Sequence, residues 1–201
     1  MRKSFFSDME KAVLFGLVFS VLISLAGFES GCDDLRKNVL RLHIIANSDS
    51  DYDQAVKLKV RDKILSLSGN AFDNCTDLKD AESTVSGKLR DYESAARGVL
   101  AENGFNYGAK AELKEDWFDI REYDDFTLPA GNYRSLTVTL GEGKGHNWWC
   151  VIYPSVCLGS SSKALSKSVG KKGCRIATAP KKYVYRFKIA EIYQKIKRKF
   201  R

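Results

Sequence analysis

The chain has 201 residues, of which 44% are hydrophobic and 29% charged. This length suits one packed domain with appendages, and eleven Phe, nine Tyr and three Trp exclude a low-complexity, disordered chain. The formal net charge of +8 is unevenly placed: residues 163–201 carry fourteen basic residues and one acidic residue, whereas residues 27–162 carry sixteen basic and twenty-two acidic ones. A basic tail of this kind attracts anionic lipid, an acidic partner or nucleic acid.

Residues 1–26 have the features of an export signal. Basic residues precede an uncharged run over residues 12–28, an order that favours an inside N-terminus and an outside body. Small residues permit signal-peptidase cleavage after Ala26, and the length of the run also leaves a retained anchor open. We therefore expect a signal peptide or N-terminal membrane anchor, followed by an exported domain over residues 27–162. In an exported protein, lipid or an acidic partner suits the basic tail better than nucleic acid.

The exported domain is predicted to have an α+β fold. It begins with a strand, because residues 39–46 alternate between an apolar face and a second face that carries Arg41 and His43. Two helices follow, one capped near residue 51 and the other over about 77–102, and strand-like alternation returns beyond Gly104. This order predicts an N-terminal strand and two helices that cover a mainly antiparallel sheet.

The basic tail is predicted to have two parts. Residues 163–182 are rich in Ser, Gly and Lys and are expected to form a linker. Residues 183–201 are expected to form a basic amphipathic helix. Its apolar stripe consists of Ile189, Ile192, Tyr193, Ile196 and Phe200. Such a stripe either packs on the domain or docks on a membrane surface or a partner, and the sequence leaves both open.

Export places the cysteines where disulfides persist. The five are Cys32, Cys75, Cys150, Cys157 and Cys174. Because the number is odd, at least one is unpaired or pairs between chains. Cys150 and Cys157 are the best candidates for a disulfide, since a cis Tyr153–Pro154 bond in a type VI turn would place them opposite each other. The alternative is that both are buried thiols.

The sequence also contains residue types that occur in catalytic and metal-binding sites. His43, Asn47 and Cys150 are the residue types of a thiol hydrolase, although their spacing alone does not bring them together. The acidic residues at 49, 51 and 53 lack the glycine and glutamate of a calcium loop and fit helix capping better. The acidic run over 115–125 fits a solvated face. We therefore predict no metal and no cofactor.

Two motif-rich segments resemble the stage II sporulation protein R family. The first segment has RLHIIANSD at 41–49, DQ at 53–54 and KLKVRD at 57–62. The second has LPAGNY at 128–133, GEGKG at 141–145, NWWC at 147–150 and Cys157. Both occur in the family's order, and the resemblance covers roughly residues 38–158.

This resemblance implies a signalling role in endospore formation. Members of the family are made in the forespore and exported into the space between the two facing membranes. There they switch on a membrane-embedded aspartic protease of the mother cell, which removes the pro-segment of the early mother-cell sigma factor. By this resemblance the chain is expected to activate a protease and to perform no catalysis itself.

The residues expected to contact the protease lie on the outward strand face, in the loop that follows it and in the paired tryptophans. They are Arg41, His43, Asn47, Asp53, Trp148 and Trp149. Exposed aromatic residues commonly carry interface energy. The basic C-terminal helix is expected to assist at the membrane surface. The competing hypotheses are an exported Cys/His thiol hydrolase and a structural component of the spore envelope.

Overall fold

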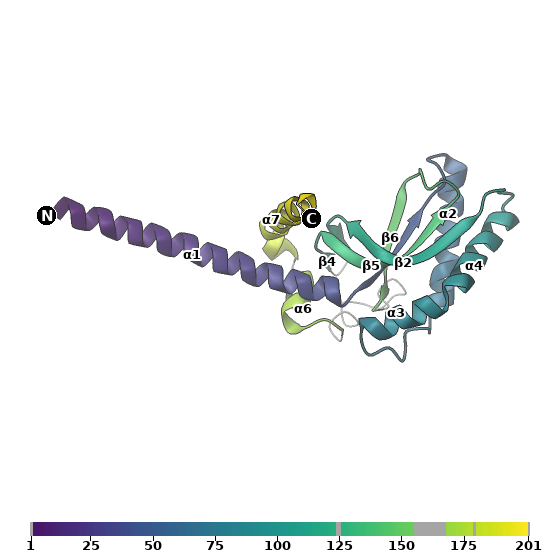
Figure 1. Ribbon diagram of the computed structural model, residues 1–201, viewed down its shortest axis with the longest axis horizontal. Coiled ribbons are helices and arrows are strands. Elements are labelled where there is room, and N and C mark those ends of the chain that lie inside the picture. Colours follow the sequence, from purple (N-terminus) through teal and green to yellow (C-terminus); the bar gives the residue numbers. More distant parts are fainter. Residues whose placement is uncertain (1, 124–125, 155–167, 179, 201) are drawn as a thin grey trace.

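The chain forms an α+β body from which one long helix projects (Figure 1), in a computed structural model that describes residues 2–123, 126–154, 168–178 and 180–200. In chain order the elements are α1 (Arg2–Lys37), β1 (Leu40–Ile45), α2 (Asp51–Ser68), α3 (Leu78–Gly87), α4 (Leu89–Glu102), β2 (Ala109–Phe118), β3 (Arg121–Glu122), β4 (Thr127–Leu128), β5 (Gly131–Leu140), β6 (Asn147–Tyr153), α6 (Lys171–Thr178) and α7 (Pro180–Lys199). The α+β class predicted from the sequence is therefore confirmed.

The central sheet has the strand order β2-β5-β1-β6. β1 is parallel to β5, with Leu42 opposite Leu136, and antiparallel to β6, with Leu42 opposite Cys150. β2 is antiparallel to β5. The sheet is thus mixed, and the expectation of a mainly antiparallel sheet is wrong. The parallel pair arises because α2, α3, α4 and β2 separate β1 from β5, a connection long enough to return the chain in the same direction.

The N-terminal element is a helix and not a strand. α1 runs from the predicted export signal into the body, so the predicted strand, β1, comes only after eleven further helical residues, 27–37. No proline occurs in residues 2–37, and nothing stops the helix at the predicted cleavage position. Asn38 marks its end, because the Asn38 side-chain amide donates to the Asp34 carbonyl at 2.8 Å.

Three helices lie where the sequence predicted two. α2 begins after Ser50, whose hydroxyl accepts a hydrogen bond from the Asp53 backbone N–H at 3.2 Å. The second predicted helix is divided at Lys88 into α3 and α4. Gly87 precedes this break, and glycine is a poor helix former because its backbone loses more entropy on folding.

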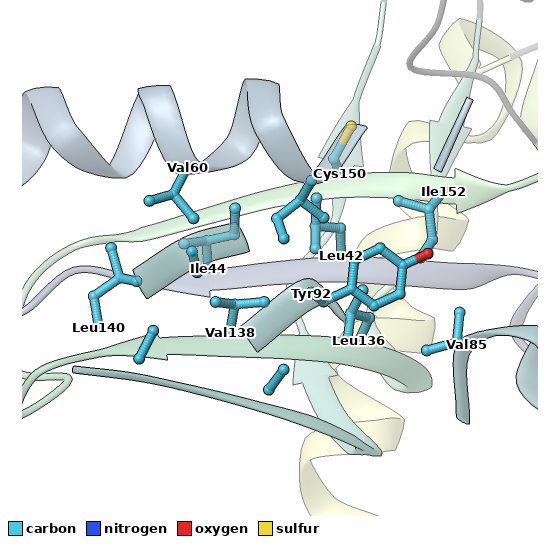
Figure 2. Packing of buried hydrophobic residues seen from close by; sticks show 14 of the residues in the cluster. Leu42, Ile44, Val60, Val85, Tyr92, Leu136, Val138, Leu140, Cys150 and Ile152 are labelled. Atoms are coloured by element: carbon cyan, nitrogen blue, oxygen red, sulfur yellow. The ribbon is translucent and has the colours of Figure 1, made fainter. Parts of the chain in front are cut away.

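The main core lies between these three helices and one face of the sheet (Figure 2). The strand residues predicted to share a buried face, Leu40, Leu42 and Ile44, are all fully buried there. They meet apolar residues from β5, β6 and the helices, among them Val60, Val85, Tyr92, Leu136, Val138, Leu140 and Ile152. The alternation over residues 39–46 therefore identified the core face of β1 correctly.

A second apolar cluster lies on the opposite face of the sheet. It joins the C-terminal part of α1 to β5, β6 and the C-terminal helices, through residues that include Phe28, Cys32, Leu35, Phe118, Leu128, Tyr133, Val151, Ile176 and Phe187. This cluster covers only part of that face. The remaining part carries polar side chains.

The C-terminal segment differs from the sequence prediction in two ways. Part of the expected linker, 163–182, is helical, because α6 packs Ile176 and Ala177 into the second cluster. α7 is a helix as predicted, but it docks on the body through Tyr183, Phe187 and Ala190. The stripe predicted from the sequence is a different face of α7, and it stays exposed.

Candidate functional site

Four polar side chains meet on the sheet face opposite the main core. The Nδ1 atom of His43 lies 2.9 Å from Asp116 Oδ2, and its Nε2 atom lies 3.0 Å from Asn147 Oδ1. The Thr137 hydroxyl donates to the same Asp116 oxygen at 2.5 Å. These residues belong to β1, β2, β5 and β6, so each strand of the central sheet supplies one. We call this group the His43 cluster.

The two contacts of His43 restrict its protonation. Ionised Asp116 only accepts hydrogen bonds, so Nδ1 of His43 donates to it. Nε2 then donates to Asn147 from an imidazolium, or accepts from the Asn147 amide after rotation of that amide. Burial raises the pKa of Asp116, but hydrogen bonds from His43 and Thr137 outweigh burial and hold this pKa at about 2. The cluster therefore keeps a partly buried carboxylate ionised beside the imidazole.

The cluster contains a histidine–carboxylate pair. Among the residues that the structure describes, no hydroxyl or thiol is hydrogen-bonded to His43, and the Thr137 hydroxyl faces the carboxylate instead. Among the described residues, no group of three or more His, Cys, Asp or Glu side chains is placed to hold a metal ion. Asn147 is the exposed member of the cluster, whereas His43 and Thr137 are buried and the Asp116 side chain is 15% exposed.

Arg41 lies beside the His43 cluster but is fully buried. Its guanidinium lies 4.0 Å from the centroid of the Phe118 ring and donates to the Tyr123 hydroxyl at 2.9 Å. Burial lowers the pKa of Arg41, and its Nη1 atom has no hydrogen-bond partner within the described residues. Arg41 therefore has no surface of its own to offer a partner, and it acts on the cluster by holding Phe118 in place.

Asn47 and Asp53 hold the loop between β1 and α2. Asp53 accepts hydrogen bonds from the Asn47 amide at 2.9 Å, from the Ser48 hydroxyl at 2.5 Å and from the Tyr107 hydroxyl. Burial raises the pKa of Asp53, but these hydrogen bonds outweigh burial and lower it. Asn47 and Asp53 therefore stabilise this loop, and their part in binding a partner stays a prediction.

The same loop is joined to the glycine-rich turn over residues 141–145. The Asn47 side-chain oxygen accepts from the Glu142 backbone N–H at 3.0 Å. A Cβ atom on Gly141 would lie 2.2 Å from that oxygen, and one on Gly145 would lie 2.1 Å from the Ser48 carbonyl oxygen. Two segments that the sequence showed as separate motifs are therefore parts of one tightly packed pair of loops.

Trp148 and Trp149 lie on opposite faces of β6. Trp148 packs against the main core, with the Arg61 guanidinium 4.5 Å from its ring centroid. Trp149 packs against the second cluster, with its ring centroid 6.1 Å from that of His43 and 5.8 Å from that of Phe118. Both indoles are partly exposed, but only Trp149 belongs to the surface around the His43 cluster.

Cys150 lies among the residues of the main core (Figure 2), whereas His43 lies with Asp116 and Asn147 on the opposite face of the sheet. Cys150 is opposite Leu42 in the register and is buried in the main core with it. Asn47 is bonded to Asp53 rather than to His43. The three residues considered for thiol hydrolysis are therefore not assembled into a site. Cys157 lies outside the described residues, so the Cys150–Cys157 disulfide stays a prediction, while the Tyr153–Pro154 bond that it requires is cis.

Three members of the His43 cluster were missed by the sequence reasoning. Asp116 was assigned to a solvated acidic run, and Thr137 and Asn147 were not singled out. Alternation in β2 does separate Asp116 from the apolar Ala111 and Leu113. However, the positions of β2 and β5 relative to His43 depend on strand order and register, which local patterns do not contain.

Comparison with known proteins identifies the family. The sequence model of the stage II sporulation protein R family matches residues 36–163, a range that contains all four residues of the His43 cluster and both joined loops. The chain belongs to the stage II sporulation protein R family. The resemblance expected from the motifs is therefore confirmed, and the chain is a sporulation protein.

A curated relative supports this membership. Stage II sporulation protein R of Bacillus subtilis (strain 168) is 31% identical over 150 residues, which cover 72% of this chain and 67% of the relative. No solved structure matches the chain. The family match begins at Arg36 and ends before α6, so α6, α7 and most of α1 lie outside the region matched to the stage II sporulation protein R family.

Proposed function

We propose that the chain is an exported signalling protein that activates a membrane-embedded aspartic protease of the mother cell, and so triggers maturation of the early mother-cell sigma factor. The observation that carries this proposal is the family match over residues 36–163. The proposed role rests on the family resemblance. The geometry supports two parts of it: export through α1 and a contact surface at the His43 cluster. Activation requires tighter binding to the active arrangement of the protease than to its inactive one.

The proposed export is supported by α1. The segment Asp8–Lys37 is long and apolar enough to cross a membrane. Its apolar side chains between Val13 and Ile23 are 49% to 73% exposed, and burial in the body begins at Phe28. Cleavage after Ala26 would thus leave the packed part of α1 with the body, and retention would leave an anchor. Both fates deliver the body into the space between the forespore and mother-cell membranes.

The proposed contact surface is the polar half of the sheet face that carries the His43 cluster. It combines the exposed Asn147 with the partly exposed Asp116 and Trp149 side chains, and the buried His43 imidazole joins Asn147 to Asp116. Aromatic residues surrounded by hydrogen-bonding groups are typical of interface centres. Buried Arg41 packs against Phe118 next to this surface, and Asn47 and Asp53 fix the loop that follows β1.

Co-expression in a non-sporulating bacterium tests the proposed function. The full chain, the protease and a tagged sigma-factor precursor are produced together, and precursor cleavage is followed by immunoblot. Cleavage is expected only when all three are present, and it should disappear when residues 1–26 are deleted because the body then stays in the cytosol. Absence of cleavage with the full chain contradicts the activator role, whereas equal cleavage by the truncated chain contradicts the need for export.

A further inference from the structure

The C-terminal helices surround α1 at the level where it leaves the body. α6 and α7 both pack against α1 (Figure 1). The contact with α6 is close, because a Cβ atom on Gly31 would lie 2.4 Å from the Ile176 side chain. This level separates two environments, since the apolar side chains before Ser24 are exposed and Phe28 is buried.

Three cations gather at this level. A cavity of about 200 Å³ is lined by Ser24 and Gly27 of α1 together with Lys172, Arg175 and Arg186. Among the described residues its lining contains no acidic side chain, whereas the neighbouring groove, which Arg186 also lines, contains Glu29 and Asp33. None of the three cations forms an ion pair within the described residues, and Lys172 and Arg175 are exposed. We call these three residues the cationic collar.

An apolar surface continues from the collar along α7. Six side chains at spacings of three and four residues are 47% to 86% exposed: Tyr185, Ile189, Ile192, Tyr193, Ile196 and Phe200. Ile189 and Tyr193 share a groove of about 480 Å³ with Leu25 and Ala26 of α1. The stripe is therefore continuous with the end of the exposed apolar part of α1.

These observations concern neighbouring parts of the surface where α1 leaves the body. The exposed apolar residues of α1, the three cations of the collar and the exposed apolar stripe of α7 lie next to one another, which is the order of environments at the edge of a bilayer. A soluble partner would explain the stripe alone, but it would not explain why the stripe adjoins a helix able to cross a membrane. Cations at this depth match the phosphate groups of anionic phospholipids.

We infer that the cationic collar binds the phosphates of anionic phospholipids and that the stripe of α7 lies in the membrane surface beside α1. The body is then held against the bilayer in a fixed orientation, whether or not α1 is later cleaved. This inference rests on the export part of the proposed function but not on the protease, so the two fail separately.

Lipid quenching of an introduced tryptophan tests this orientation. The full chain carrying Ile192→Trp is reconstituted in nanodiscs that contain brominated phospholipids, with or without phosphatidylglycerol. The emission of the chain without this substitution supplies the background from the three native tryptophans. Quenching of the introduced tryptophan is expected to be several-fold stronger with phosphatidylglycerol than with phosphatidylcholine alone and to weaken at high salt.

Two charge variants complete the test. K172Q/R175Q/R186Q is expected to lose most of the quenching, whereas K63Q/K79Q/K88Q, which removes the same charge from α2, α3 and the α3–α4 junction, should retain it. Thermal unfolding checks that both variants are folded. Quenching that is unaffected by the collar substitutions would overturn the role of the collar. Absence of quenching in every bilayer would place the stripe in water or against a protein and overturn the inference as a whole.

Discussion

His43 and Asp116 are 73 residues apart in the sequence, and their side chains meet with 2.9 Å between Nδ1 and Oδ2. β5 lies between the two strands that carry them, so the contact passes over Thr137 of the middle strand. The pair can form only after β1, β5 and β2 are assembled in the observed register. This contact therefore ties the proposed binding surface to the complete fold.

The Asp116 carboxylate is expected to make the free energy of unfolding depend on pH in the acidic range. Because its folded pKa of about 2 lies below the ordinary 3.8, ionisation stabilises the fold above about pH 4. This contribution is lost as the pH falls through the folded value, and it amounts to about 2 kcal/mol at most. In urea unfolding at about pH 7 and about pH 2, D116N should lose less stability on acidification than the natural chain. Equal losses would contradict the assignment.

Glycine at position 145 is expected to be required by the joined loops. A methyl group there would collide with the Ser48 backbone, so Gly145→Ala should lower the free energy of unfolding by about 1–3 kcal/mol. Gly98→Ala is the matched control. Gly98 lies inside α4 with nothing within 4 Å of the added Cβ, and alanine should stabilise this helix by about 0.5–1 kcal/mol. Thermal unfolding of both variants compares the two effects directly, and similar effects would refute the loop packing.

The two adjacent tryptophans are expected to differ in function. Trp149→Ala should reduce precursor processing about tenfold or more, because this indole borders the His43 cluster. Trp148→Ala should leave processing largely unchanged when folding is matched, since Trp148 packs on the main-core side. Asn147→Ala, at an exposed position, should also reduce processing without loss of stability. A larger defect for Trp148→Ala would place the binding surface on the other face of the sheet.

The predicted disulfide can be mapped chemically. Peptides of the exported protein, separated without reduction, are expected to contain Cys150 joined to Cys157, while Cys32, Cys75 and Cys174 carry free thiols. Alkylation before digestion prevents exchange among them. Recovery of Cys150 and Cys157 as two alkylated residues would refute the pairing.

Local patterns in the sequence predicted much of the fold and part of the site. Alternation over residues 39–46 separated Leu42 from His43, and that separation places one in the main core and the other in the His43 cluster. The continuation of α1 was missed because residues 29–37, which follow the apolar run, carry five charged side chains and show only Cys32 and Leu35 as larger apolar residues. Asp116 was missed because its partner is determined by strand order, a long-range property.

The most direct measurement uses purified components. The exported protein is added to the outer side of proteoliposomes that contain the protease, and cleavage of the sigma-factor precursor on the inner side is measured against the concentration of added protein. The account predicts cleavage that saturates with concentration, requires the aspartates of the protease and is reduced by N147A. Cleavage by the chain without the protease, or no cleavage at any concentration, would contradict it.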